Sequence, residues 1–151
     1  MSDNKERGFA VVKGYVGKGI ILPTRQTKGS AGYDIASAED VIVPAGKNAV
    51  CNTGLKAFMQ AGEVLKIYAR SSLSARGLTL ANGVGIIDSD YCDNPDNEGH
   101  IRVILHNYSD RDALITKGER IAQGIFEKYL EAGEENTKLS SRKGGIGSTG
   151  R

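Results

Sequence analysis

Short apolar runs rich in Val and Ile alternate along this chain with polar segments that contain glycine. The clearest runs cover residues 9–12, 41–43, 64–68 and 101–105, and residues such as Gly, Pro, Asn or Asp separate them. Runs of this length between turn residues are typical of β-strands. Strands at such close spacing predict an all-β fold, either a sandwich or a jelly-roll β-barrel.

One segment, 71–76, favours a short helix, with Ser71 as its N-cap and Gly77 as its stop. Segment 120–129 has apolar positions that suit either a strand or a helix. From residue 131 the chain turns polar and then rich in Gly and Ser, which predicts a flexible C-terminal tail. We therefore expect one β-domain over residues 1–130 and a tail over 131–151.

Composition narrows the class of protein. A chain of 151 residues fits one domain, and its 20 glycines indicate many turns. The net charge of +2, with both signs scattered along the chain, argues against nucleic acid or a membrane as the main partner. Two cysteines make neither a disulfide framework nor a metal knuckle. Without an apolar segment typical of a signal peptide, a soluble, cytoplasmic location is expected.

The third of five polar, glycine-bearing segments, 83–91, carries the most distinctive chemistry. It places Asp88 and Tyr91 three residues apart, shortly after two glycines. A glycine turn lets the backbone approach a ligand closely, so Asp88 can serve as a base and Tyr91 as a flat packing surface. The other four segments cover residues 31–35, 69–73, 120–123 and 144–150.

In this order and spacing, the five segments resemble the five motifs of the trimeric dUTP pyrophosphatases (dUTPases), from about Ala31 to Arg151. The resemblance implies a homotrimeric jelly-roll enzyme that hydrolyses dUTP to dUMP and pyrophosphate with magnesium. That reaction keeps uracil out of DNA and supplies dUMP for thymidylate synthesis. The resemblance also implies active sites shared between three subunits, and it favours a strand over 120–129.

Phosphate binding is expected at Arg70, Ser71 and Ser72. A guanidinium fork and hydroxyls suit phosphate oxygens, although an isolated triplet of this kind is usually a capped surface helix with a solvated arginine. The resemblance assigns all three to the triphosphate. It places Gln123 beside the phosphates and the attacking water, where the alternative is a half-exposed strand glutamine.

Two carboxylates receive separate roles. The resemblance gives Asp34 the magnesium ion, through coordinated waters, and magnesium relies on substrate phosphates rather than an all-protein cage. We expect Asp88 to orient and deprotonate the attacking water, and its apolar flank predicts partial desolvation. Asp90 should point to the opposite strand face, as a structural or interface carboxylate. Spacing alone leaves the reverse assignment of these last two open.

Recognition of the nucleoside is expected in the same region. The resemblance places Tyr91 against deoxyribose, where it leaves no room for a 2′-hydroxyl. Asn82 offers the donor and acceptor that the uracil edge needs. Backbone groups of residues 83–87, among them Gly85 and Ile87, complete the recognition, and a tight hairpin excludes the methyl group of thymine.

By resemblance, the glycine-rich tail closes over the active site of a neighbouring subunit, which excludes water and aligns the triphosphate. Ile146 stands where the family usually has phenylalanine, so apolar cover replaces stacking on uracil. The usual arginine lies three residues before the paired glycines, whereas here it lies two before them. The residues assigned to the terminal phosphate are Gly147, Ser148, Thr149 and either Arg142 or Lys143.

Segment 92–98 replaces what is normally one residue in the family. It is acidic and rich in turn residues, which suits a rim of the pocket, a contact for an additional protein partner, or a tolerated surface loop. A surface loop is the favoured interpretation.

Two other functions compete. A dCTP deaminase of the same fold has a similar phosphate motif, but it needs a glutamate where this chain has Ile104, and isoleucine cannot transfer protons. A trimeric regulatory binding protein would suit the altered lid and the insertion. A pure scaffold, however, has no need of the whole set formed by Asp34, Arg70, Asp88, Tyr91 and Gln123.

Overall fold

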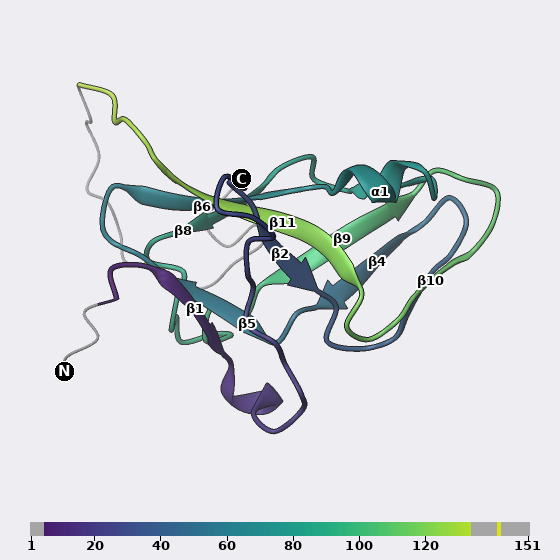
Figure 1. The fold of residues 1–151 in the computed structure, drawn as a ribbon, viewed down its shortest axis with the longest axis horizontal. Helices are drawn as coiled ribbons and strands as arrows, with labels where there is room; N and C mark the ends of the chain where they lie inside the picture. The colour runs from purple at the N-terminus through teal and green to yellow at the C-terminus, as the bar shows by residue number, and fades with distance from the viewer. Residues whose placement is uncertain (1–4, 134–141, 143–151) are drawn as a thin grey trace.

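The computed structural model describes residues 5–133 and Arg142. Over that range the chain is built almost entirely from strands (Figure 1). The strands are β1 (Gly8–Val11), β2 (Tyr33–Ala36), β3 (Val41–Val43), β4 (Asn48–Asn52), β5 (Leu55–Phe58), β6 (Glu63–Tyr68), β7 (Leu78–Leu80), β8 (Gly85–Asp88), β9 (Arg102–Asn107), β10 (Ala113–Ile115) and β11 (Arg120–Lys128). One short 3-10 helix, η1 (Lys13–Tyr15), and one short α-helix, α1 (Ser71–Ser74), complete the described elements.

Antiparallel pairing groups the described strands into four sheets. The largest has the order β2-β11-β6-β8, and a second has the order β4-β9-β7. Two pairs, β1-β5 and β3-β10, complete the set. Figure 1 shows the long strand β11 running between β2 and β6. The predicted all-β class, with one short helix, is confirmed.

A single apolar core joins the sheets. Burial alternates along β9, where Val103, Leu105 and Asn107 are buried and their neighbours are more exposed, as expected for side chains that point to opposite faces. Ile35 of β2 and Leu65 of β6 belong to the same buried cluster as the residues of β9. Each fully buried aliphatic side chain contributes about 1.5–3 kcal/mol.

Local structure around the predicted helix differs from expectation. The helix is shorter than predicted, and Arg70 rather than Ser71 occupies its N-cap position, with extended backbone and no side-chain cap. Gly77, the predicted stop, does not end the helix, which finishes at Ser74; it takes a φ of +73°, which favours glycine, in the turn that leads into β7. Segment 120–129, whose pattern suited either class, is the strand β11, with a register irregularity between Arg120 and Ala122.

No helix in the described part of the chain is long and apolar enough to cross a bilayer. Most of the predicted tail lies outside the described residues, including Lys143, Ile146, Gly147, Ser148 and Thr149.

Candidate functional site

Three predicted residues meet at one end of the largest sheet and form what we call the Asp34 cluster, namely Asp34, Arg70 and Gln123. Gln123 of β11 pairs with Asp34 of β2 on one side and with Tyr68 of β6 on the other. Directly opposed residues share a face of the sheet, so the register places Asp34 and Gln123 together. Arg70 follows β6 by two residues, and its Nε lies 3.2 Å from Asp34 Oδ1.

Polar contacts surround the Asp34 carboxylate, whose side chain is only 13% exposed. Gln26 Nε2 donates a hydrogen bond of 2.9 Å to Asp34 Oδ2, and Arg120 Nη1 lies 3.5 Å from the same oxygen. Gln123 Nε2 donates to the Ala69 carbonyl at 3.2 Å. With Gln26 and Arg120, the Asp34 cluster therefore brings together one carboxylate, two guanidinium groups and two amides.

The absence of a side chain at Gly32 leaves space for the Gln123 side chain. A Cβ at residue 32 would overlap Gln123 Oε1 and would lie 3.2 Å from Gln123 Cβ. The glycine of the first motif is therefore needed for close approach to the fourth motif, rather than for a left-handed backbone.

An open pocket of about 370 Å³ lies beside the cluster. Its lining residues are Ala69, Arg70, Ser71, Ser74, Leu78, Thr79 and Tyr108. Ser71 and Ser72 are both exposed at the start of α1, and Ser71 lines the pocket with Arg70. This pocket places a guanidinium group and a hydroxyl on one open surface, as an anion requires.

A second group, the Asp88 cluster, consists of Asp88, Asp90, Tyr91 and Arg142. Asp88 is the last residue of β8. The Arg142 guanidinium contacts both carboxylates, by Nη2 to Asp88 Oδ2 and by Nε to Asp90 Oδ1 at 2.8 Å. Its central carbon lies 6.0 Å from the centroid of the Tyr91 ring. The chain thus holds a cation between the two carboxylates, beside an aromatic ring.

One expectation about these carboxylates is wrong. Asp90 does not point away from Asp88, because β8 ends at Asp88 and the turn that follows no longer alternates faces. The Asp88 side chain is 49% exposed, so the single chain covers about half of it. Of its apolar neighbours, Ile86 is 54% exposed and Ile87 packs against the core.

The predicted base-reading segment forms the turn between β7 and β8. Asn82 is exposed in that turn, and Gly83 has a φ of +75°. A Cβ on Gly85 would lie 3.0 Å from Ile67 Cβ, so Gly85 packs closely on the core. β8 is the edge strand of its sheet, and an edge strand presents unpaired backbone groups on its outer side. Those groups can read a base as predicted.

The two clusters lie apart within one chain. Asp88 pairs with Val64 of β6, whereas Gln123 pairs with Tyr68 of the same strand. Four residues of strand correspond to about 13 Å. Because Val64 and Tyr68 are an even number of residues apart, both clusters lie on the same face of the sheet. The chain alone does not bring Asp88 to Gln123.

A family model named dUTPase matches residues 18–150. The chain belongs to the dUTPase family. Lactococcus lactis has a deoxyuridine 5′-triphosphate nucleotidohydrolase that is 52% identical over 148 residues, which cover 97% of this chain and 99% of that protein. The crystal structure of the dUTPase from Streptococcus mutans has a TM-score of 0.80 and 42% identity, and covers 84% of this chain and 99% of that one.

A more distant dUTPase shares the fold. A mutant dUTPase from phage phi11 of S. aureus is 20% identical, with a TM-score of 0.70, and covers 89% of this chain and 98% of that one. Its structure is described as revealing the coordination of a structural Mg(II) ion. The all-β fold of this chain is thus shared with a protein that is only 20% identical to it.

The sequence did not point to two residues that contact Asp34, namely Gln26 and Arg120. Arg120 lies inside the fourth motif, and its charge next to Gln123 was a usable signal. Gln26 lies in a polar loop, and no sequence pattern singles it out. Segment 92–98 lies at the surface, with Asp93, Pro95 and Asp96 exposed, but the Asn94 side chain within it is only 6% exposed, which the sequence did not indicate.

Proposed function

We propose that this chain hydrolyses dUTP to dUMP and pyrophosphate. The observation that carries the proposal is the Asp34 cluster, where strand register brings a carboxylate, an arginine and a glutamine together beside an open pocket. The 52% identity to a deoxyuridine 5′-triphosphate nucleotidohydrolase supports the same substrate.

The residues proposed to bind the triphosphate are Arg70, Ser71, Ser72 and Gln123. Arg70 now pairs with Asp34 at 3.2 Å, and a guanidinium group can exchange that partner for phosphate oxygens without losing charge-assisted hydrogen bonds. Most of the catalytic effect in phosphoryl transfer comes from positioning and charge stabilisation, which such a cluster supplies.

Asp34 is the residue that would hold a magnesium ion. Within residues 5–133 and Arg142, no group of three or more His, Cys, Asp or Glu could hold a metal. A single carboxylate next to the phosphate-binding residues fits an ion that is bound mainly by waters and substrate phosphates. When bound, the ion neutralises phosphate charge. The ion described for the phage phi11 dUTPase is a structural Mg(II) ion, so a protein of this fold binds the same metal.

Asp88 is the proposed general base. A water oxygen attacks the α-phosphorus, its proton passes to the Asp88 carboxylate, and the bond from the α-phosphorus to the bridging oxygen breaks to release pyrophosphate. In the chain described, the carboxylate pairs with Arg142. The same arginine is a ligand we propose for the terminal phosphate, and Lys143 is the alternative.

Shared active sites follow from the separation of the two clusters. About 13 Å of strand lies between Asp88 and Gln123 in one chain, which exceeds the reach of one water molecule. A homotrimer in which a second subunit supplies Asp88 and Tyr91 would complete the site. The tail, with Arg142 or Lys143 and with Ile146, Gly147, Ser148 and Thr149, would come from a third subunit. Asn82 and the backbone of Gly85 and Ile87 would read uracil.

A cytoplasmic location fits the two cysteines. Cys51 and Cys92 are both free, and burial raises the pKa of the Cys51 thiol to about 11. Unpaired thiols are usual in a reducing compartment.

The test is product analysis with dUTP, dCTP, dTTP and UTP, each with magnesium and with a chelator. We expect pyrophosphate from dUTP alone and only with the metal. Ammonia from dCTP would support the deaminase, and no product from any of the four would support the binding protein.

A further inference from the structure

The hydroxyl of Tyr91 is held on both sides by hydrogen bonds whose directions are fixed. Tyr91 Oη donates to the His100 carbonyl at 2.7 Å, and Asn97 Nδ2 donates to Tyr91 Oη at 3.0 Å. Gly99 N donates to Asn97 Oδ1 at 3.0 Å. A backbone N–H can only donate and a carbonyl can only accept, so the amide of Asn97 has one orientation that satisfies all partners.

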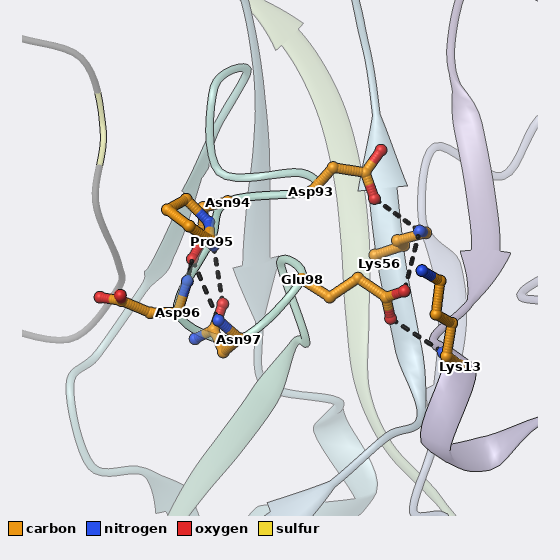
Figure 2. Close-up of a pocket in the computed structure, with 8 residues that line it drawn as sticks. All are labelled: Lys13, Lys56, Asp93, Asn94, Pro95, Asp96, Asn97 and Glu98. Atoms are coloured by element: carbon orange, nitrogen blue, oxygen red, sulfur yellow. Dashed lines mark hydrogen bonds and ion pairs between the residues drawn. The ribbon is translucent and has the colours of Figure 1, made fainter.

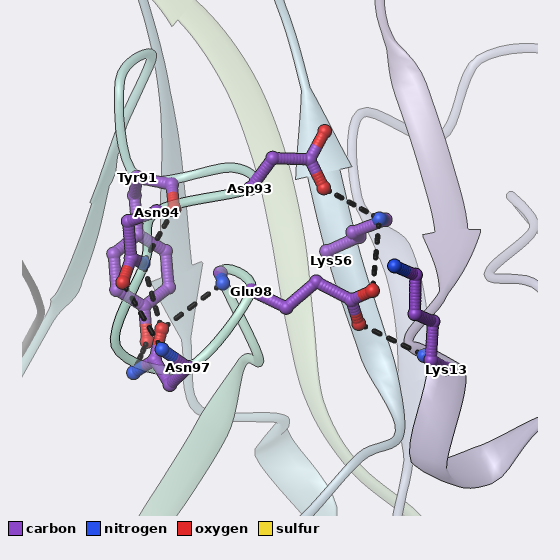
Figure 3. A network of polar contacts seen from close by, with 8 residues as sticks. Lys13, Lys56, Tyr91, Asp93, Asn94, Asn97 and Glu98 are labelled. Carbon is purple, nitrogen blue, oxygen red and sulfur yellow. Dashed lines mark hydrogen bonds and ion pairs between the residues drawn. The ribbon is translucent and has the colours of Figure 1, made fainter.

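A second amide fixes the first. Asn94 Oδ1 accepts from the backbone N–H groups of Asp96 and Asn97 at 3.0 and 3.2 Å. Its Nδ2 therefore donates, to Asn97 Oδ1 and to the Tyr91 carbonyl, both at 2.7 Å. Figure 3 shows Asn97 at the hydroxyl end of the Tyr91 ring. Tyr91, only 8% exposed, is thus held both at its backbone carbonyl and at its hydroxyl.

The backbone of the loop is strained at the points where it closes. Asp93 and Glu98 have φ values of +58° and +63°, which cost L-residues of this kind about 1–2 kcal/mol each. Gly99, at +84°, has no room for a Cβ, which would lie 2.7 Å from the Tyr91 carbonyl oxygen and from Cys92 Cα. Strained residues persist where the contacts around them over-determine the backbone, and they cluster at functional sites.

Charged contacts attach the other side of the loop to the domain. Lys56 Nζ lies 2.5 Å from Asp93 Oδ1 and 3.5 Å from Glu98 Oε1, and Lys13 N donates to Glu98 Oε2 at 2.8 Å. The hydrogen bond from Lys56 is the main cause of the lowered pKa of Asp93. Figure 2 shows these four residues apart from the turn that carries Asn97. The loop therefore connects β5 and η1 to the Tyr91 ring.

We propose that Asn97, oriented by Asn94, is a positioning residue that sets the place of the Tyr91 ring and thereby the preference for deoxyribose over ribose. The inference rests on the proposed function, in which Tyr91 packs against the sugar. A ring that excludes one hydroxyl must be placed to within a fraction of an ångström. A hydroxyl held by Asn97 and His100 supplies that precision, which an apolar contact alone does not.

The decisive measurement is the ratio of kcat/KM for dUTP to kcat/KM for UTP, from pyrophosphate release by the full chain. We expect Asn97→Ala to lower the ratio about tenfold, the size of effect that 1.4 kcal/mol produces. Tyr91→Phe, which keeps the ring and removes the hydroxyl, should have a similar effect. The double variant should be no worse than Tyr91→Phe alone, because phenylalanine already lacks the hydroxyl to which Asn97 donates.

Asp96→Ala is the matched control. The Asp96 side chain is exposed in the same loop, and only its backbone N–H enters the network. We expect its ratio to match that of the unmodified chain. A fall equal to that of Asn97→Ala would overturn the proposal, because the loop as a whole would then be responsible. Effects of Asn97→Ala and Tyr91→Phe that multiply in the double variant would also overturn it.

Failure of the inference differs from failure of the proposed function. If thermal denaturation shows that Asn97→Ala is not folded, Tyr91→Phe takes its place as the deciding variant. An unchanged ratio of kcat/KM for dUTP and UTP in Tyr91→Phe then overturns the inference. If Tyr91→Leu abolishes the preference while folded Asn97→Ala keeps it, the inference fails and the role of Tyr91 stands. If Tyr91→Leu keeps the preference, the sugar contact itself is wrong, and the inference falls with it.

Discussion

The Asp34 cluster and the Asp88 cluster are built in different ways. In the first, neighbouring strands β2 and β11 set Asp34 against Gln123 by register alone, and Arg70 follows at the end of β6. In the second, Asp90 and Tyr91 lie in a turn beyond β8, and side-chain amides of a later loop hold the Tyr91 ring. Geometry set by a sheet tolerates changes in side chains nearby, whereas geometry set by a loop depends on each amide.

The largest expected effect tests which of the two carboxylates in the Asp88 cluster is the general base. Asp88→Asn should lower kcat about 10²- to 10⁴-fold, because the water loses its base, while nucleotide binding measured by calorimetry stays nearly unchanged. Asp90→Asn is the matched variant, since both carboxylates contact Arg142. A loss of turnover in Asp90→Asn, with Asp88→Asn still active, would transfer the role of base to Asp90.

A second prediction tests the register-built cluster. Gly32→Ala should displace the Gln123 side chain, because the new Cβ would overlap Gln123 Oε1, and a shift of about 1 Å can cost up to about 100-fold in rate. The loss of rate is measured by steady-state kinetics with dUTP. Gly29→Ala is the control, since nothing lies within 4 Å of a Cβ there. Equal rates in the two variants would contradict the role of Gln123 beside the phosphates.

A third prediction tests the loop. Gly99→Ala combines a left-handed backbone with a clash against the Tyr91 and Cys92 backbone, so the free energy of unfolding should fall by roughly 2–5 kcal/mol. Gly118→Ala, at a φ of +85° with open space around it, should lose only about 1–2 kcal/mol. Urea unfolding of the two variants and of the unmodified chain measures these losses in free energy. Similar losses would show that the loop accommodates the methyl group.

The smallest expected effect concerns pH. Burial, and then the charge of Arg102, lower the pKa of His100 below its ordinary value of 6.5. As pH falls through 6.5, the unfolded chain takes up this proton and the folded chain does not, so stability decreases. His100 Nε2 also accepts a hydrogen bond from Gly54 N, which protonation would break.

The comparison for this prediction is His100→Gln, which keeps an acceptor without a titrating ring. The midpoint of urea unfolding is measured for both proteins at about pH 7.5 and about pH 5.5. The decrease in midpoint from the higher to the lower pH should be larger for the unmodified chain than for His100→Gln. Parallel losses in the two proteins would mean that other groups cause the acid destabilisation.

How far the sequence predicts this molecule depends on what fixes each residue. Alternation of apolar and polar positions locates strands such as β6 and β9, and motif residues in strands, Asp34 and Gln123 among them, meet as expected. Residues beyond a strand end are harder, because the pattern does not show where alternation stops. Asp90 was misplaced for that reason.

Side-chain networks are harder still. The sequence shows that 92–98 contains turn residues, but it does not show which amide is buried against a tyrosine. Asn94 and Asn97 occur in an ordinary turn-like run, and their importance comes from contacts to Tyr91 that only coordinates reveal. Likewise, the wrong N-cap at Ser71 could not be detected, because serine caps helices often and Arg70 rarely does.

The closure of the loop has a consequence for how such enzymes diverge. Asp93 N bonds the Glu98 carbonyl at 2.9 Å, so the segment leaves and re-enters the domain at nearly one point. A segment of this kind can be acquired by a lineage with little disturbance of the flanking strands. Once the Tyr91 hydroxyl is bound to Asn97, however, deleting the segment leaves that tyrosine without its partner. A segment that closes on itself and binds a neighbouring side chain is therefore easier to gain than to lose.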